Sequence, residues 1–253
     1  MSSFSISIIV FASVFGGALL GILLRRVLPD HHLGQDSKDV VKVAMGLVAT
    51  MAALVLGLLT ATAKGTFDTE SDELKKTAAT IITLDRYLAA YGPETKEIRE
   101  EIRRALAARL DLTWPEDRSR RATLDTTEAS TTLEAIVNKI YALSPQNEAQ
   151  RRLQSKSLEV ANDVLGTRWL LLTQAGNTIP FPLLVMTVFW LSVLFVSFGL
   201  FAPSNATVIA ALLLCAISVS GSTFLILEMN RPLQGMVKVS SEPLRFAYSQ
   251  LGK

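Results

Sequence analysis

Four stretches of the chain are apolar and free of charged side chains: residues 5–24, 43–63, 182–201 and 206–227. Each has about 20 residues, the length that an α-helix needs to cross about 30 Å of hydrocarbon. Charged side chains appear directly outside them, among them Arg25, Lys42, Lys64 and Glu228. The pattern therefore predicts four transmembrane helices, two near each end of the sequence. The fold class that we expect is all-α.

Residues 65–178, between the two pairs of apolar stretches, combine charges with apolar positions at helical spacing. No proline occurs between residues 37 and 91, so the second membrane helix is predicted to continue to Tyr91, where Gly92-Pro93 stops it. Further helices are predicted over 94–113, 131–143, 147–174 and 242–251. In the first of these, one buried stripe is expected, made by Ile98, Ile102, Leu106 and Leu110.

The charged positions of this middle region are interpreted as solvated helix faces, including Asp85-Arg86 and the cluster around Glu100 and Arg103. The predicted division of the chain is 1–64 for the first two membrane helices, 65–178 for a helical cytoplasmic domain, 179–228 for the last two membrane helices, and 229–253 for a cytoplasmic tail. The cytoplasmic side is assigned because Lys and Arg near the membrane favour the side that carries both termini.

Composition excludes several classes of function. The net charge is only +2, so no strong field favours nucleic acid, and we expect none as a partner. One cysteine and two adjacent histidines, His31 and His32, do not suffice for an ordinary zinc site. Nucleotide-binding, nucleophile and zinc-protease motifs do not occur in the sequence. We therefore predict that the protein is not an enzyme and has no cofactor and no metal.

The second apolar stretch carries a stripe of small and hydroxylated residues between two lysines. At spacings of three or four residues, which place them on one helix face, it contains Lys42, Gly46, Thr50, Ala53, Gly57, Thr60 and Lys64. Such a face either packs closely against a helix or lines a conduit when several copies surround an axis. Both hypotheses remain open from the sequence. The opposite face carries Leu47, Met51, Leu54 and Leu58, which suit lipid or a helix partner.

Small and hydroxylated residues also occur in the first and fourth apolar stretches. Gly17 and Gly21 form a GxxxG pair, which is typical of close helix packing. The fourth stretch contains hydroxyl groups that we expect to bond across helices, at Ser218, Ser220, Ser222 and Thr223.

The whole chain resembles the bestrophin-like family of bacterial integral membrane proteins. The segments that carry the resemblance are RRVLPDHHL (25–33), SKDVVK (37–42), GLVATMAALVLGL (46–58), LSPQN (143–147), GLFAPSNAT (199–207) and PLR (243–245). The resemblance implies a multi-pass protein of the bacterial inner membrane. It also implies a homo-oligomer, a pentamer as in bestrophins, whose second membrane helix lines a pore for small inorganic anions.

Two features depart from bestrophins. The second apolar stretch has no aromatic residue, whereas bestrophin necks are ringed by bulky apolar and aromatic side chains. No acidic run of the kind that binds calcium in animal bestrophins is present, so calcium gating is not implied. The alternative to a channel is a membrane-anchored helical scaffold or signalling module that does not conduct.

Overall fold

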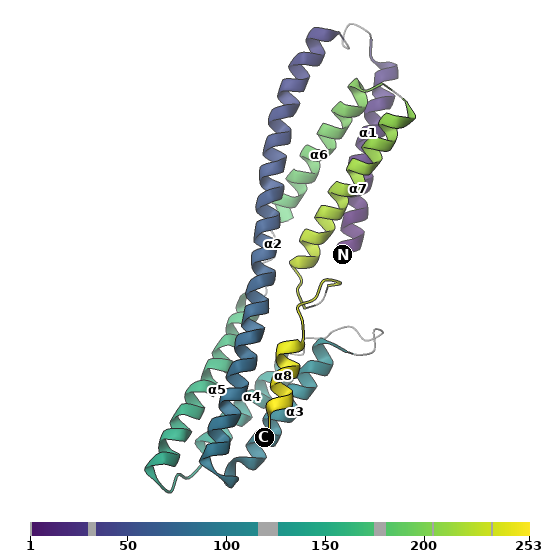
Figure 1. Cartoon of the computed structure of the whole chain (residues 1–253). Coiled ribbons are helices and arrows are strands. Elements are labelled where there is room, and N and C mark those ends of the chain that lie inside the picture. Colours follow the sequence, from purple (N-terminus) through teal and green to yellow (C-terminus); the bar gives the residue numbers. More distant parts are fainter. Residues whose placement is uncertain (1, 30–33, 116–125, 175–180, 204, 234) are drawn as a thin grey trace. The chain divides into compact units, whose positions relative to one another are not determined.

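The structure is a computed structural model that describes residues 2–29, 34–115, 126–174, 181–203, 205–233 and 235–253 (Figure 1). In chain order the elements are α1 (Ser3–Val27), α2 (Gln35–Tyr91), a short 3-10 helix (Pro93–Thr95), α3 (Lys96–Thr113), α4 (Thr126–Tyr141), α5 (Glu148–Gln174), α6 (Phe181–Phe201), α7 (Ala206–Met229) and α8 (Glu242–Gln250). No strand occurs in these ranges, which confirms the all-α class.

Four of the helices are long and apolar enough to cross a membrane, and they are α1, α2, α6 and α7. They contain the four predicted stretches, which confirms the four-span pattern. The second is by far the longest, since α2 continues for 57 residues. It ends where predicted: Gly92 has a φ of 142°, a conformation that favours glycine, and Pro93 follows.

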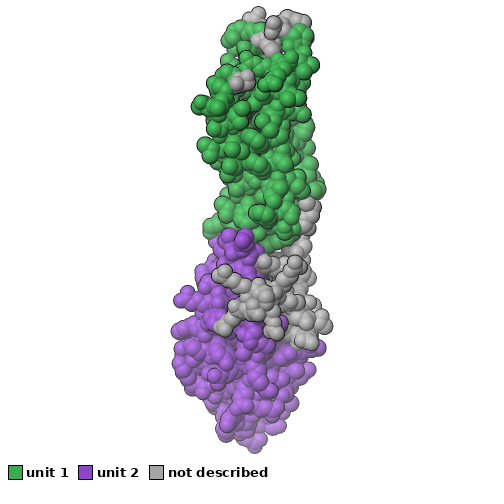
Figure 2. Space-filling view, turned by 90° about the vertical axis from the view of Figure 1, so that its right-hand side faces the viewer, with its two compact units in different colours: residues 1–66, 178–231 green, residues 67–177, 232–253 purple. Residues whose placement is uncertain are grey.

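The chain forms two compact units, coloured separately in Figure 2. Unit 1 comprises residues 1–66 and 178–231, and unit 2 comprises residues 67–177 and 232–253. The helix α2 contributes its first part to unit 1 and its second part to unit 2. The last segment of the chain, residues 232–253, therefore belongs to compact unit 2.

In unit 1, α1 packs along both α6 and α7. Their shared core is buried and apolar, and it consists of Val10, Val14, Ala18, Phe195, Leu212 and Ala216. A second, smaller cluster joins α2 to α7 through the buried residues Leu59, Ala63 and Ile226, and the partly buried Leu183 of α6 packs against it. These contacts use the apolar side of each helix, as expected from burial of apolar surface.

One hydroxyl group bonds between α7 and α1. Ser220 donates to the backbone carbonyl of Ser7 at 2.7 Å, as the sequence had suggested. The expectation was wrong for Ser218, Ser222 and Thr223, which donate to carbonyls of their own helix one turn earlier. A hydroxyl inside a helix satisfies its hydrogen locally unless a neighbouring carbonyl lies within reach.

The core of unit 2 is formed by α2, α3, α4, α5 and the C-terminal segment. The predicted stripe of α3 is buried in it, and residues from the C-terminal segment complete it: Val239, Leu244, Ala247 and Leu251. Trp114 at the end of α3 donates from Nε1 to the carbonyl of Val239 at 2.9 Å. The side chain of Asn147 accepts from the N–H of Gln150 at 2.8 Å and so caps the start of α5.

Asp85 corrects the interpretation of this part of α2 as a solvated face. Its side chain is only 1% exposed and is paired with Arg99 of α3, with nitrogen–oxygen distances of 2.7 and 2.9 Å. The backbone N–H of Gly252 also points to Asp85, at 3.4 Å. The hydrogen bonds that Arg99 donates to Asp85 raise the pKa of the Arg99 guanidinium. This buried pair therefore joins α2, α3 and the C-terminal segment.

Candidate functional site

The stripe of α2 is uncovered throughout its length in the single chain. All of its members are exposed: Lys42, Gly46, Thr50, Ala53, Gly57, Thr60 and Lys64. A Cβ atom added at Gly46 or at Gly57 would meet nothing within 4 Å. The structure thus keeps the stripe on one face of one helix and packs none of it closely within the protomer.

The part of α2 that does pack lies on a different face. Ala52, Leu59 and Ala63 are buried, and they lie about 120° around the helix from the centre of the stripe. A third face carries Leu54 and Leu58, which are 66% and 59% exposed. In the most apolar 18-residue segment of α2, only 11% of the residues are buried. The corresponding shares for α1, α6 and α7 are 28%, 39% and 28%. Among the four spans, α2 therefore leaves the most surface for contacts outside the protomer.

The two threonines of the stripe use their hydroxyl hydrogens within the helix. Thr50 donates to the carbonyl of Gly46 at 2.9 Å, and Thr60 donates to that of Leu56 at 2.8 Å. In this arrangement their oxygen lone pairs, and not their hydrogens, face outward. An anion needs donors, so these hydroxyls would have to turn before they could stabilise one.

A carboxylate accompanies the lysine near the Gln35 end of the stripe. The ammonium of Lys42 lies 3.6 Å from Oδ1 of Asp39, and both side chains are well exposed. An exposed pair of this kind contributes at most about 1 kcal/mol to stability. Its charges, however, are those that an ion approaching this end of α2 would meet.

Gly17 and Gly21 lie against α6. A Cβ at Gly21 would overlap the backbone carbonyl of Val196, and one at Gly17 would be 3.0 Å from the carbonyl of Ser192. The approach is reciprocal, because a Cβ at Gly199 of α6 would overlap the carbonyl of Ala18 on α1. Gly199 was missed in the sequence because no second glycine lies one turn away to mark it.

The two helices are also joined near their ends, where the guanidinium of Arg25 donates to the carbonyl of Ala202. This bond satisfies a carbonyl just beyond the C-terminal end of α6. Arg25 therefore has a structural contact at the end of α1.

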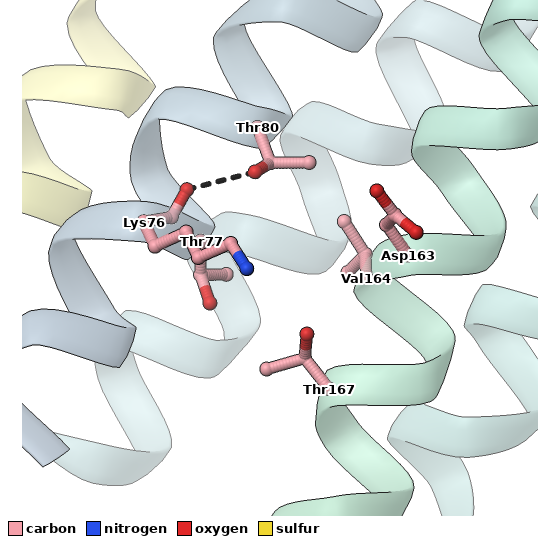
Figure 3. A pocket seen from close by; sticks show the side chains of 6 residues that line it. All are labelled: Lys76, Thr77, Thr80, Asp163, Val164 and Thr167. Atoms are coloured by element: carbon pink, nitrogen blue, oxygen red, sulfur yellow. Dashed lines mark hydrogen bonds between the residues drawn. The ribbon is translucent and has the colours of Figure 1, made fainter. Parts of the chain in front are cut away.

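A small hollow lies between α2 and α5 in unit 2 (Figure 3). It is lined by Lys76, Thr77, Thr80, Asp163, Val164 and Thr167, and its volume is about 10 Å³. That is room for about one water molecule. Thr80 donates to the carbonyl of Lys76 at 2.8 Å, as the dashed line shows. A hollow of this size does not accommodate an organic substrate.

Within the ranges that the structure covers, no three His, Cys, Asp or Glu side chains come together as metal ligands. His31 and His32 lie outside the described residues, as do residues 116–125, a segment rich in charged side chains.

Comparison with known proteins places these features in context. The model of a family described as "Bestrophin-like domain" matches residues 11–244. Three crystal structures of point mutants of a bacterial bestrophin homologue from Klebsiella pneumoniae are similar, with TM-scores of 0.62, 0.60 and 0.61. They are 15%, 16% and 15% identical, and cover 96%, 94% and 94% of this chain and 96%, 97% and 97% of their own. At this identity the likeness shows a shared fold. A search of curated proteins gives no match.

Proposed function

The chain belongs to the bestrophin-like family, and from that premise we propose that it forms a homo-oligomeric membrane channel for small inorganic anions, with α2 lining the pore. Anion conduction is the activity that the family resemblance implies. The pentamer is the assembly that the family resemblance implies. The proposal also places unit 2 and both termini on the cytoplasmic side of a bacterial inner membrane, because Lys and Arg near the membrane favour that side.

One observation supports the role of α2 above all: its lysine-ended stripe is exposed along the span that packs least within the protomer. Facing hydrocarbon, Lys42 and Lys64 would be costly unless their ammonium groups reached the interface. Facing an axis shared by several copies, the stripe would border water along its length. The small side chains at Gly46 and Gly57 would leave room for an ion there.

The three faces of α2 fit this arrangement. The face of Leu59 and Ala63 is already covered by residues of α6 and α7. The leucine face suits lipid or the next copy, and the remaining face is the stripe. Since the faces are about 120° apart, each can meet a different neighbour.

Selectivity is tested most directly at Lys64. The ammonium groups at 42 and 64 are separated by 22 residues, or about 33 Å along the helix, close to the thickness of the hydrocarbon core. Copies arranged around an axis would repeat Lys64 as a ring at one mouth. Such a ring attracts anions and repels cations.

The experiment is recording from the purified full-length protein in planar bilayers with asymmetric chloride. Lys64→Glu should shift the reversal potential toward cation permeation. Lys75→Glu is the matched control, because Lys75 lies 11 residues, or about 16 Å, farther along α2, beyond the roughly 8 Å screening length of physiological salt. A Lys64→Glu reversal potential equal to that of the wild type would refute the pore assignment. Absence of current from every form would leave the non-conducting scaffold.

A further inference from the structure

The mouth of the stripe at the Gln35 end carries both signs of charge. Asp39 lies 3.6 Å from the ammonium of Lys42, and Gln35 donates from Nε2 to the same carboxylate oxygen at 3.4 Å. At 100° per residue, Asp39 lies within about 20° of Gly46 around the helix, so it is on the stripe itself. The side chains of Lys42 and Asp39 are 66% and 61% exposed, so neither is buried in the protomer.

An ammonium beside a carboxylate acts on a distant ion as a dipole, and its field falls off faster than that of a single charge. Repeated around an axis, the pair makes a nearly neutral ring in place of a cationic one. On the basis of the proposed function, we infer that Asp39 is a specificity-determining residue: it offsets Lys42 and limits the preference of this mouth for anions over cations.

The interior of the stripe makes this role more important. Thr50 and Thr60 have committed their hydroxyl hydrogens to backbone carbonyls, so they offer an anion no donor in the observed arrangement. The glycine and alanine positions offer no side-chain donor at all. Discrimination by charge therefore rests on the ends of the stripe, where Asp39 is placed.

A role in stability does not explain Asp39. An exposed ion pair at i, i+3 on one helix typically contributes only a few tenths of a kcal/mol (about 0.2–0.5) to stability, and salt screens it further. Neutralising Asp39 should consequently leave folding intact and change only what an ion meets. The two roles are therefore separable by experiment.

The test measures reversal potentials of the full-length protein in planar bilayers under a sodium chloride gradient. Asp39→Asn should raise the ratio of anion to cation permeability by at least about twofold, because one unit charge at roughly 8 Å, screened by physiological salt, favours an anion and disfavours a cation by about 1.4-fold each. Lys42→Gln should shift the ratio the other way, because it leaves Asp39 unbalanced. The double variant Asp39→Asn/Lys42→Gln should return close to the wild-type ratio.

The matched control is Asp72→Asn. Asp72 forms the same type of i, i+3 pair on the same helix, with Lys75 at 2.9 Å, and it is also exposed. It lies about 80° around the helix from the centre of the stripe, so its neutralisation should leave the ratio unchanged.

Opposite shifts for Asp39→Asn and Lys42→Gln would support the inference. A wild-type ratio in Asp39→Asn, or a shift equal to that of Asp72→Asn, would overturn it while conduction itself stood. If Lys64→Glu alters selectivity and the Asp39 and Lys42 variants do not, the pore assignment survives and this inference fails. Absence of current from the wild type would overturn both.

Discussion

Replacing Asp85 by asparagine should strongly destabilise unit 2. The side chain keeps its shape but loses its charge, and Arg99 is left without a counter-charge beside the amide. Removal of one partner from a buried pair typically costs about 3–5 kcal/mol. Arg99 retains 19% exposure of its side chain, so water compensates part of the loss and we expect about 3 kcal/mol.

The assay is thermal unfolding of the purified full-length protein, followed by tryptophan fluorescence. Trp114 is a suitable reporter, because its indole bonds to Val239 in the C-terminal segment. For a chain of this size 1 kcal/mol corresponds to about 2–4 °C, so Tm should fall by about 6–12 °C. Asp111→Asn serves as the control, since Asp111 lies on α3 and is exposed.

A fall in Tm of less than about 2 °C for Asp85→Asn, or one equal to that of Asp111→Asn, would refute the reasoning. A second variant examines the cause. In Asp85→Leu/Arg99→Met both charges are removed together, so no unpaired charge remains in the core. Replacement of a buried ion pair by apolar residues is often neutral. The double variant should therefore be more stable than Asp85→Asn.

Two further predictions concern other contacts. Gly21→Ala should lower Tm, because the added Cβ would overlap the backbone of α6 and overpacking costs about 1–3 kcal/mol. Gly16→Ala is the control and should leave Tm unchanged, since a Cβ there would meet nothing within 4 Å. Equal Tm values for the two variants would contradict the close approach of α1 and α6. Lys139 donates to Glu97 at 2.9 Å, and this bond lowers the pKa of Glu97 from 4.5. A lowered pKa stabilises the fold above pH 4.5, and the benefit disappears as pH falls through the folded value. The Tm difference between wild type and Lys139→Met should thus be present at pH 7 and shrink toward pH 3; the same loss in Lys96→Met, an exposed control, would argue against it.

The spans and the long α2 could be predicted because their causes are local in sequence. A membrane-spanning helix needs about 20 consecutive apolar residues, which can be read directly from the sequence. The end of α2 at Gly92-Pro93 is a property of those two residues. The buried stripe beginning at Ile98 follows in the same way from spacing. Such features do not depend on which helix becomes the neighbour.

Asp85 and Gly199 could not be predicted, because their environments are made by residues distant in the sequence. In the sequence, Asp85 and Arg86 look like neighbouring charges on a solvated helix face. In the structure, Asp85 is paired with Arg99 on the next helix. The exposed stripe of α2 presents the same problem in a stronger form. Its neighbour in the proposed channel is another copy of the chain, so its role as pore lining stays a prediction.

The discontinuity of unit 2 has a consequence for biosynthesis. Its first part, residues 67–177, is synthesised before α6 and α7, and the remainder, residues 232–253, only after them. Buried residues of this late part, such as Leu244 and Leu251, complete the core around α3. While the last two spans are being inserted, the nascent unit must therefore keep apolar surface exposed, a state open to chaperones and to misassembly. Full protection of this unit from proteases should appear only after α7 has entered the membrane.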